Sequence, residues 1–187
     1  MTIPDIPTVP GKSGQSRSGL AYHILGTIQQ VLAVDLDHGR SVYSDAGSMS
    51  WITDSIEMNT HTGGGLGGMF RRAISGASVF VVDFEARSGH GQVAFSTDFP
   101  GKVLPFDLDE GQSVLMHKHA FICAEKSVKL DIAFTRKLGA GLFGSAGFIL
   151  QRLTDPGIVF AELDGDAIEY HLQPGTEMIF RKRNPSF

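Results

Sequence analysis

The chain has very little cysteine, because Cys123 is the only one among its 187 residues. A single thiol excludes an intrachain disulfide, and its place in the apolar run 121–124 predicts a small buried core residue rather than a reactive nucleophile. No run approaches the roughly 20 apolar residues of a transmembrane helix, and the N-terminus lacks the apolar core of a signal peptide. We therefore expect a soluble, cytoplasmic protein without a transmembrane segment.

An excess of basic residues is also missing. The chain has 16 Lys and Arg against 20 Asp and Glu, for a formal net charge of -4. General nucleic-acid binders normally carry a basic face, so we expect no nucleic-acid partner. The G-x-S-x-G motif of serine hydrolases is absent as well. The paired aspartates at 35/37 and 107/109 precede glycines, which indicates turn formation rather than acid–base catalysis.

Residues 1–20 contain three prolines followed by Gly, Ser and basic residues, a composition that predicts a flexible tail. From Tyr22 onward, short apolar runs alternate as in strands and end at Gly, Asp or Pro. We therefore predict an all-β fold with one short helix at 69–74. Besides the strand that includes residues 31–36, strands are predicted at 41–45, 78–86, 91–96, 113–117, 119–124, 148–153, 157–163 and 166–172.

One phrase occurs twice in the chain. Residues 34–42 (VDLDHGRSV) return as residues 106–114 (FDLDEGQSV), and a weaker copy begins at Tyr170. Such repetition predicts stacked copies of one supersecondary unit, and the glycine of each copy predicts a turn that needs positive φ. We predict a single β-repeat domain over 21–187, with units at about 21–100 and 101–165 and a truncated third unit at 166–187.

Glycines are concentrated at residues 63–68, in the G-x-G-x-x-G pattern. Their backbone amides, together with two arginines on the predicted short helix, can form an anion site. A dinucleotide site requires a long helix in a βαβ unit, and the similar glycine run at 139–144 favours a structural turn. The candidate anion-binding residues are Gly63, Gly64, Gly65, Gly67, Gly68, Arg71 and Arg72.

The segment from Gly111 to Glu125 resembles the first metal-binding motif of cupins. His117 and His119 are two residues apart, so on a strand they face the same side and can bind one transition-metal ion. Glu125 is the candidate third ligand, but it stands farther from the histidines than in cupins, and the second cupin motif is missing. Two polar residues on a solvent-facing or subunit-facing strand are the favoured interpretation, so no cofactor is expected.

An ordered set of motifs extends from residue 22 to residue 179. It comprises YHI at 22–24, DAGSM at 45–49, the glycine run at 63–68, RAISGASVF at 72–80, FPGKV at 99–103 and GLFGSAGF at 141–148. This set resembles the family named for altered inheritance of mitochondria. The resemblance implies a β-sandwich similar to the tryptophan RNA-binding attenuation protein, several β-units per chain and a trimeric, ring-like assembly. It implies no catalytic residues.

Three hypotheses about function remain at this point. The leading one is a non-enzymatic, oligomeric β-repeat protein that acts as an assembly or interaction module, with a further protein partner left open. The second is a cupin-like metal-dependent enzyme that uses His117 and His119. The third is anion or nucleotide binding at the glycine run 63–68.

Overall fold

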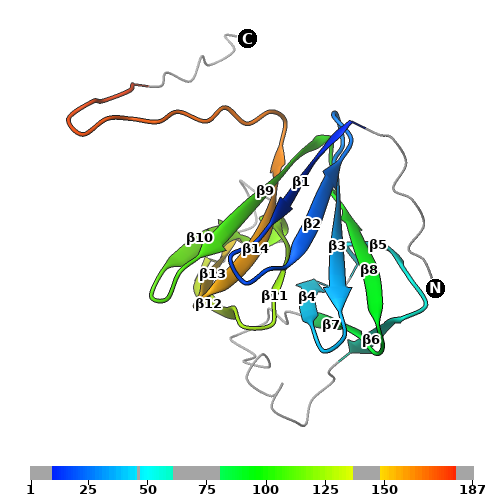
Figure 1. Cartoon of the computed structure of the whole chain (residues 1–187). Helices are drawn as coiled ribbons and strands as arrows, with labels where there is room; N and C mark the ends of the chain where they lie inside the picture. Colours follow the sequence, from blue (N-terminus) through cyan, green and yellow to red (C-terminus); the bar gives the residue numbers. More distant parts are fainter. Residues whose placement is uncertain (1–9, 46, 61–80, 137–147, 180–187) are drawn as a thin grey trace.

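The computed structural model describes residues 10–45, 47–60, 81–136 and 148–179 (Figure 1). The regular secondary structure within these ranges is almost entirely β-strand, so the all-β prediction is confirmed. No helix within these ranges is long and apolar enough to cross a membrane. The elements are β1 Gly11–Gln15, β2 Ala21–Leu25, β3 Val31–Asp37, β4 Ser41–Asp45, β5 Met49–Ile52, β6 Ile56–Thr60, β7 Val81–Ala86, β8 His90–Ser96, β9 Gly101–Leu108, β10 Ser113–His117, the 3-10 turn η2 Lys118–Ala120, β11 Phe121–Glu125, β12 Lys129–Arg136, β13 Phe148–Thr154 and β14 Gly157–Asp164.

The strands form three antiparallel sheets. The five-stranded sheet has the order β1-β2-β3-β8-β5, the six-stranded sheet β6-β7-β4-β11-β14-β9, and the three-stranded sheet β10-β13-β12. In the six-stranded sheet, β4 pairs with β11 and joins two halves that come from different parts of the chain. We call this β4–β11 pairing the central seam.

The six-stranded sheet is the middle of three layers, because its side chains enter two separate cores. Ile158 and Phe160 of β14 lie in the core shared with the five-stranded sheet, whereas Val159 between them lies in the core shared with the three-stranded sheet. Strand alternation produces this division, since neighbouring side chains point to opposite faces. In the first core, the rings of Tyr22 and Phe160 meet edge to face at 4.9 Å.

Strand pairings recur along the chain at matching positions. Leu36 of β3 pairs with Gly91 of β8, and Leu108 of β9 pairs with Gly157 of β14. Three further matches have the same form, in which β4–β7 corresponds to β10–β13, β5–β8 to β11–β14, and β6–β7 to β12–β13. Residues on β3, β4, β5 and β6 lie 72 positions before their counterparts on β9, β10, β11 and β12, as Leu36 lies before Leu108. Even the bulge in β5 has its counterpart in β11.

The three related glycines occupy the same kind of turn. Gly39, Gly111 and Gly175 have φ of 80°, 78° and 83°. Each turn is closed by a backbone hydrogen bond between an amide and the carbonyl three residues before it. The bonds are Arg40 to Asp37 at 2.9 Å, Gln112 to Asp109 at 3.0 Å and Thr176 to Gln173 at 2.9 Å. Glycine is suited to these sites because it adopts positive φ without steric cost.

Two boundaries differ from the sequence-based prediction at the chain ends. The tail predicted for residues 1–20 is wrong for residues 11–15, which form β1 and pair with β2. The signal was missing because β1 is an exposed edge strand without an apolar face. The strand predicted at 166–172 is also wrong, because these residues pair with no described strand and are exposed throughout.

Elsewhere the predicted strands hold with small shifts. The strand predicted at 119–124 begins at Phe121, since η2 occupies the preceding residues. The strand predicted at 78–86 is described from Val81 onward. The helix predicted at 69–74 lies outside the described residues.

Candidate functional site

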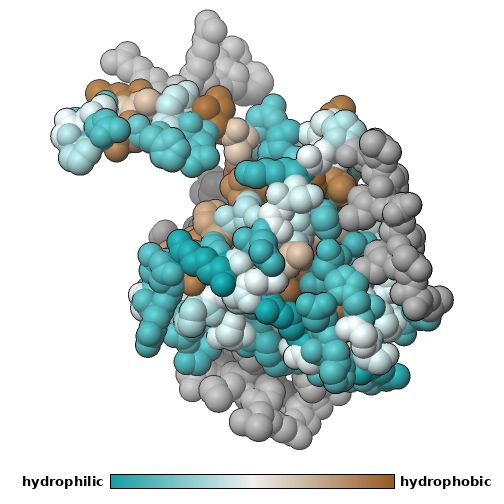
Figure 2. Space-filling view, in the orientation of Figure 1, coloured by the Kyte–Doolittle hydropathy of each residue, from teal (hydrophilic) through white to brown (hydrophobic). Residues whose placement is uncertain are grey.

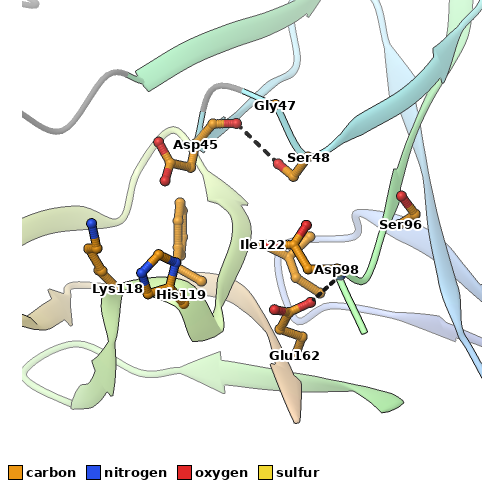
Figure 3. Close-up of a pocket in the computed structure, with 10 residues that line it drawn as sticks. Asp45, Gly47, Ser48, Ser96, Asp98, Lys118, His119, Ile122 and Glu162 are labelled. Atoms are coloured by element: carbon orange, nitrogen blue, oxygen red, sulfur yellow. Dashed lines mark hydrogen bonds between the residues drawn. The ribbon is translucent and has the colours of Figure 1, made fainter. Parts of the chain in front are cut away.

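A cavity of about 190 Å³ lies at one end of the central seam. Six segments supply its lining: the end of β4, the loop that follows it, the end of β8, the loop after β8, the η2–β11 junction and β14 (Figure 3). Because strands from both halves of the six-stranded sheet end here, their loops bring polar groups together. The lining residues are Asp45, Gly47, Ser48, Ser96, Asp98, Lys118, His119, Phe121, Ile122 and Glu162.

Glu162 is a cavity-lining carboxyl whose pKa is shifted by its surroundings. Burial raises the pKa of its carboxyl, and the nearby charges of Asp98 and Asp164 raise it further. The Asp98 backbone amide donates a 2.9 Å hydrogen bond to this carboxylate and opposes the shift, as does the proximity of His119. The cavity therefore combines carboxylates with two basic side chains, a set suited to hydrogen bonding with polar groups.

The two histidines of the cupin-like motif are close together but do not share a strand. His117 ends β10, whereas His119 belongs to η2, and their ring centroids are 5.2 Å apart. His117 Nδ1 accepts a hydrogen bond from the backbone amide of His119 at 3.4 Å. Burial lowers the pKa of His117, and the charges of His119 and Lys118 lower it further. Of the pair, only His119 lines the cavity.

Glu125 is engaged elsewhere, at the far end of β11. Its carboxylate accepts hydrogen bonds from the Ser18 hydroxyl and, at 2.8 Å, from the Ile158 backbone amide. Arg40 lies 3.9 Å from the same carboxylate. Among the described residues, no three His, Cys, Asp or Glu side chains are grouped so that they can hold a metal ion. The structure thus does not bring Glu125 to the two histidines.

The candidate anion site cannot be placed in the same way. The glycine run 63–68 and the arginines at 71 and 72 lie outside the described residues.

A second polar feature crosses the outer face of the five-stranded sheet, and we call it the polar row. His23 is bonded on one side to the Ser13 hydroxyl at 2.8 Å and on the other to Asp35 at 3.0 Å. Gln92 donates to Asp35 at 2.9 Å and accepts from the Trp51 indole at 3.4 Å. One residue from each strand of the sheet therefore joins a continuous chain of hydrogen bonds.

The first three members of the row are the residue types of a catalytic triad. In such a triad the histidine contacts serine through Nε2 and aspartate through Nδ1, whereas His23 contacts Ser13 through Nδ1 and Asp35 through Nε2. Ser13 lies on an exposed edge strand and does not line the cavity. The row is suited to tying the strands together across the sheet.

Neither the cavity nor the polar row was found from the sequence. Their residues lie far apart in the chain, as Asp35 and Gln92 do, and only the strand register brings them together. A signal for the row exists in β3, where Asp35 interrupts the apolar residues 31–36 at an outward position. Its partners become evident once β2 and β8 are known to flank β3.

These features define an all-β protein of three stacked antiparallel sheets, with a polar cavity at the junction of its two halves. The family model described as mitochondrial biogenesis AIM24 matches residues 22–184, so the chain belongs to the AIM24 family. This confirms the family resemblance found in the sequence.

Two similar proteins come from Streptococcus pyogenes. "Uncharacterized protein M6_Spy0233" of serotype M6 is 30% identical over 157 residues, which cover 80% of this chain and 62% of that protein. The crystal structure of protein SPYM3_0169 has a TM-score of 0.60 and 24% identity, covering 78% of this chain and 65% of that one. The chain therefore spans less than two thirds of the length of both relatives, and the second likeness concerns the fold alone.

Proposed function

We propose that this chain is a non-enzymatic, oligomeric β-repeat protein that acts as an assembly module. The observation that carries the proposal is the C-terminal arm, residues 166–179, which extends from the end of β14 away from the sheets (Figure 1). Ile168, Tyr170 and Leu172 are all more than half exposed. They alternate with polar residues as in a strand with one apolar face, and such a face is stabilised by contact with another surface.

The arm also fits the proposed division of the domain into units at 21–100, 101–165 and 166–187. Its turn at Gly175 has the geometry of the turns that follow β3 and β9. In the two earlier units, the segment before this turn pairs with the last strand of its own unit. We propose that a second copy of the chain covers the exposed apolar face of the arm.

The test is the mass of the full chain in solution, measured by light scattering during size-exclusion chromatography at micromolar concentration. We expect an oligomer, with a trimer as the form that the family resemblance implies. Replacement of Ile168, Tyr170 and Leu172 together by serine is expected to weaken association at least tenfold, because it removes the apolar face.

The matched control replaces Glu169 and His171 by serine, since these residues lie on the opposite face of the arm and contact each other at 3.4 Å. The control is expected to associate like the unchanged chain. A strictly monomeric full chain would contradict the proposal. If the two variants weakened self-association equally, the apolar face of the arm would not be the contact surface.

A further inference from the structure

The central seam shows how the two halves of the protein join. Tyr43 of β4 pairs with Ala124 of β11, and Ser44 pairs with Cys123. Tyr43 and Cys123 are 1% and 0% exposed. The Tyr43 hydroxyl donates to the Val128 carbonyl at 3.0 Å, so the seam is a buried, well-connected contact between strands.

The counterparts of these seam residues lie on two sheet edges. Leu115 of β10 stands 72 residues after Tyr43, and Trp51 of β5 stands 72 residues before Cys123. β10 is an edge of the three-stranded sheet and β5 an edge of the five-stranded sheet. Leu115 is 51% exposed and Trp51 41%. Two positions that are buried within the seam are therefore exposed where the corresponding strands have no neighbour among the described residues.

These two edges also lack the residues that usually protect an edge strand from pairing. β10 (SVLMH) and β5 (MSWI) contain no Lys, Arg, Asp, Glu or Pro. The other four edge strands of the described sheets each contain at least one, and examples are Lys12 in β1, Glu57 in β6, Pro105 in β9 and Lys129 in β12. We call β5 and β10 the open edges.

The geometry points to a contact between copies of this chain, in which β10 of one copy pairs antiparallel with β5 of a second copy. This inference rests on the proposed assembly function and adds a second contact surface to that of the arm. The pairing repeats the register of the central seam, with Leu115 opposite Ile52 and Met116 opposite Trp51. β10 corresponds to β4, and β5 corresponds to β11. Because β4 and β11 already pair in the central seam, β10 and β5 can pair in the same way.

The two open edges of one chain are not placed to pair with each other. They belong to the outer layers on opposite faces of the six-stranded sheet and lie on opposite sides of Figure 1. The contact therefore joins different surfaces of different copies. Such a heterologous contact continues from copy to copy until it closes into a ring.

Disulfide trapping tests the predicted register. Chains carrying Ile52→Cys are mixed with chains carrying Leu115→Cys and oxidised under mild conditions. Directly opposed residues of an antiparallel pair have Cα atoms about 4.5–5.5 Å apart, within the range that a disulfide spans. We expect a covalent dimer from this mixture. The matched control is a mixture of Ile52→Cys and Ser113→Cys chains, in which the two cysteines are two residues out of register. This mixture is expected to give at least tenfold less covalent dimer.

A charge on the open edge tests the contact without crosslinking. Leu115→Lys is expected to weaken self-association at least tenfold in sedimentation equilibrium, because it adds the kind of charge that protects other edges. The control is Met58→Lys, on the protected edge strand β6, where the side chain is 41% exposed. Circular dichroism establishes that both variants fold.

The outcomes separate the two proposals. Preferential trapping of the Ile52–Leu115 pair together with weakened association of Leu115→Lys supports the open-edge contact. An oligomer that Leu115→Lys leaves intact, with no preferential trapping, overturns this contact while the assembly function stands. A strict monomer overturns both proposals, and pairing of β10 with a different protein overturns the choice of a second copy.

Discussion

At the scale of single residues, the environment of Glu162 in the cavity makes the contribution of this side chain to stability depend on pH. Glu162 projects into the cavity from β14, between the backbone of Asp98 and the ring of His119 (Figure 3). Burial raises the pKa of this carboxyl, whereas unfolding exposes it and returns the pKa to its ordinary value. The native contribution of Glu162 is therefore most favourable at low pH and is lost as the pH rises through the native pKa.

We predict that Glu162→Gln raises the free energy of unfolding at pH 7.5 and changes it much less at pH 4.5. The amide removes the buried charge while its oxygen still accepts the Asp98 hydrogen bond. Urea unfolding at the two pH values measures the effect, with Glu169→Gln on the exposed arm as control. A larger loss of stability at pH 7.5 than at pH 4.5 would show that the carboxylate contributes favourably when ionised, and it would contradict the prediction.

At the scale of elements, the sequence predicted the strands well where a short apolar run is bounded by Gly or Asp, as in β3 and β14. It failed for β1, whose edge position requires no apolar face, and for the arm, whose apolar alternation has no partner strand among the described residues. The cavity and the polar row were beyond prediction, because the register that aligns β2, β3 and β8 is a property of tertiary pairing.

Glycines within these elements have two distinct physical roles. A Cβ on Gly101 would lie 2.2 Å from the Leu163 carbonyl oxygen in the β9–β14 pair, a clash with backbone that no rotamer relieves. A Cβ on Gly111 would meet nothing within 4 Å, and only its φ of 78° disfavours a side chain. The first role concerns packing and the second concerns conformation.

We predict that Gly101→Ala costs roughly 3 kcal/mol of unfolding free energy, because β9 must shift against β14. Gly111→Ala is expected to cost about 1 kcal/mol, the strain of positive φ. Urea denaturation of both variants measures the difference. A larger loss for Gly111→Ala would contradict the assignment of these roles.

At the scale of the whole molecule, the arm and the two open edges carry several of the exposed apolar residues. Figure 2 shows hydrophobic residues along the arm, and Leu115 and Trp51 mark the open edges. In the six-stranded sheet, β4 and β11 pair with each other and bury Tyr43 and Cys123, which correspond to Leu115 and Trp51. Assembly of copies through the same kind of pairing accounts for both open edges.

The mass of the full chain in solution, compared with that of Leu115→Lys, tests the central claim most directly. Light scattering during size-exclusion chromatography at micromolar concentration is the measurement. The unchanged chain is predicted to elute as an oligomer of defined mass, and Leu115→Lys is predicted to shift towards the monomer while remaining folded. A monomer for the unchanged chain, at every concentration examined, would contradict the claim.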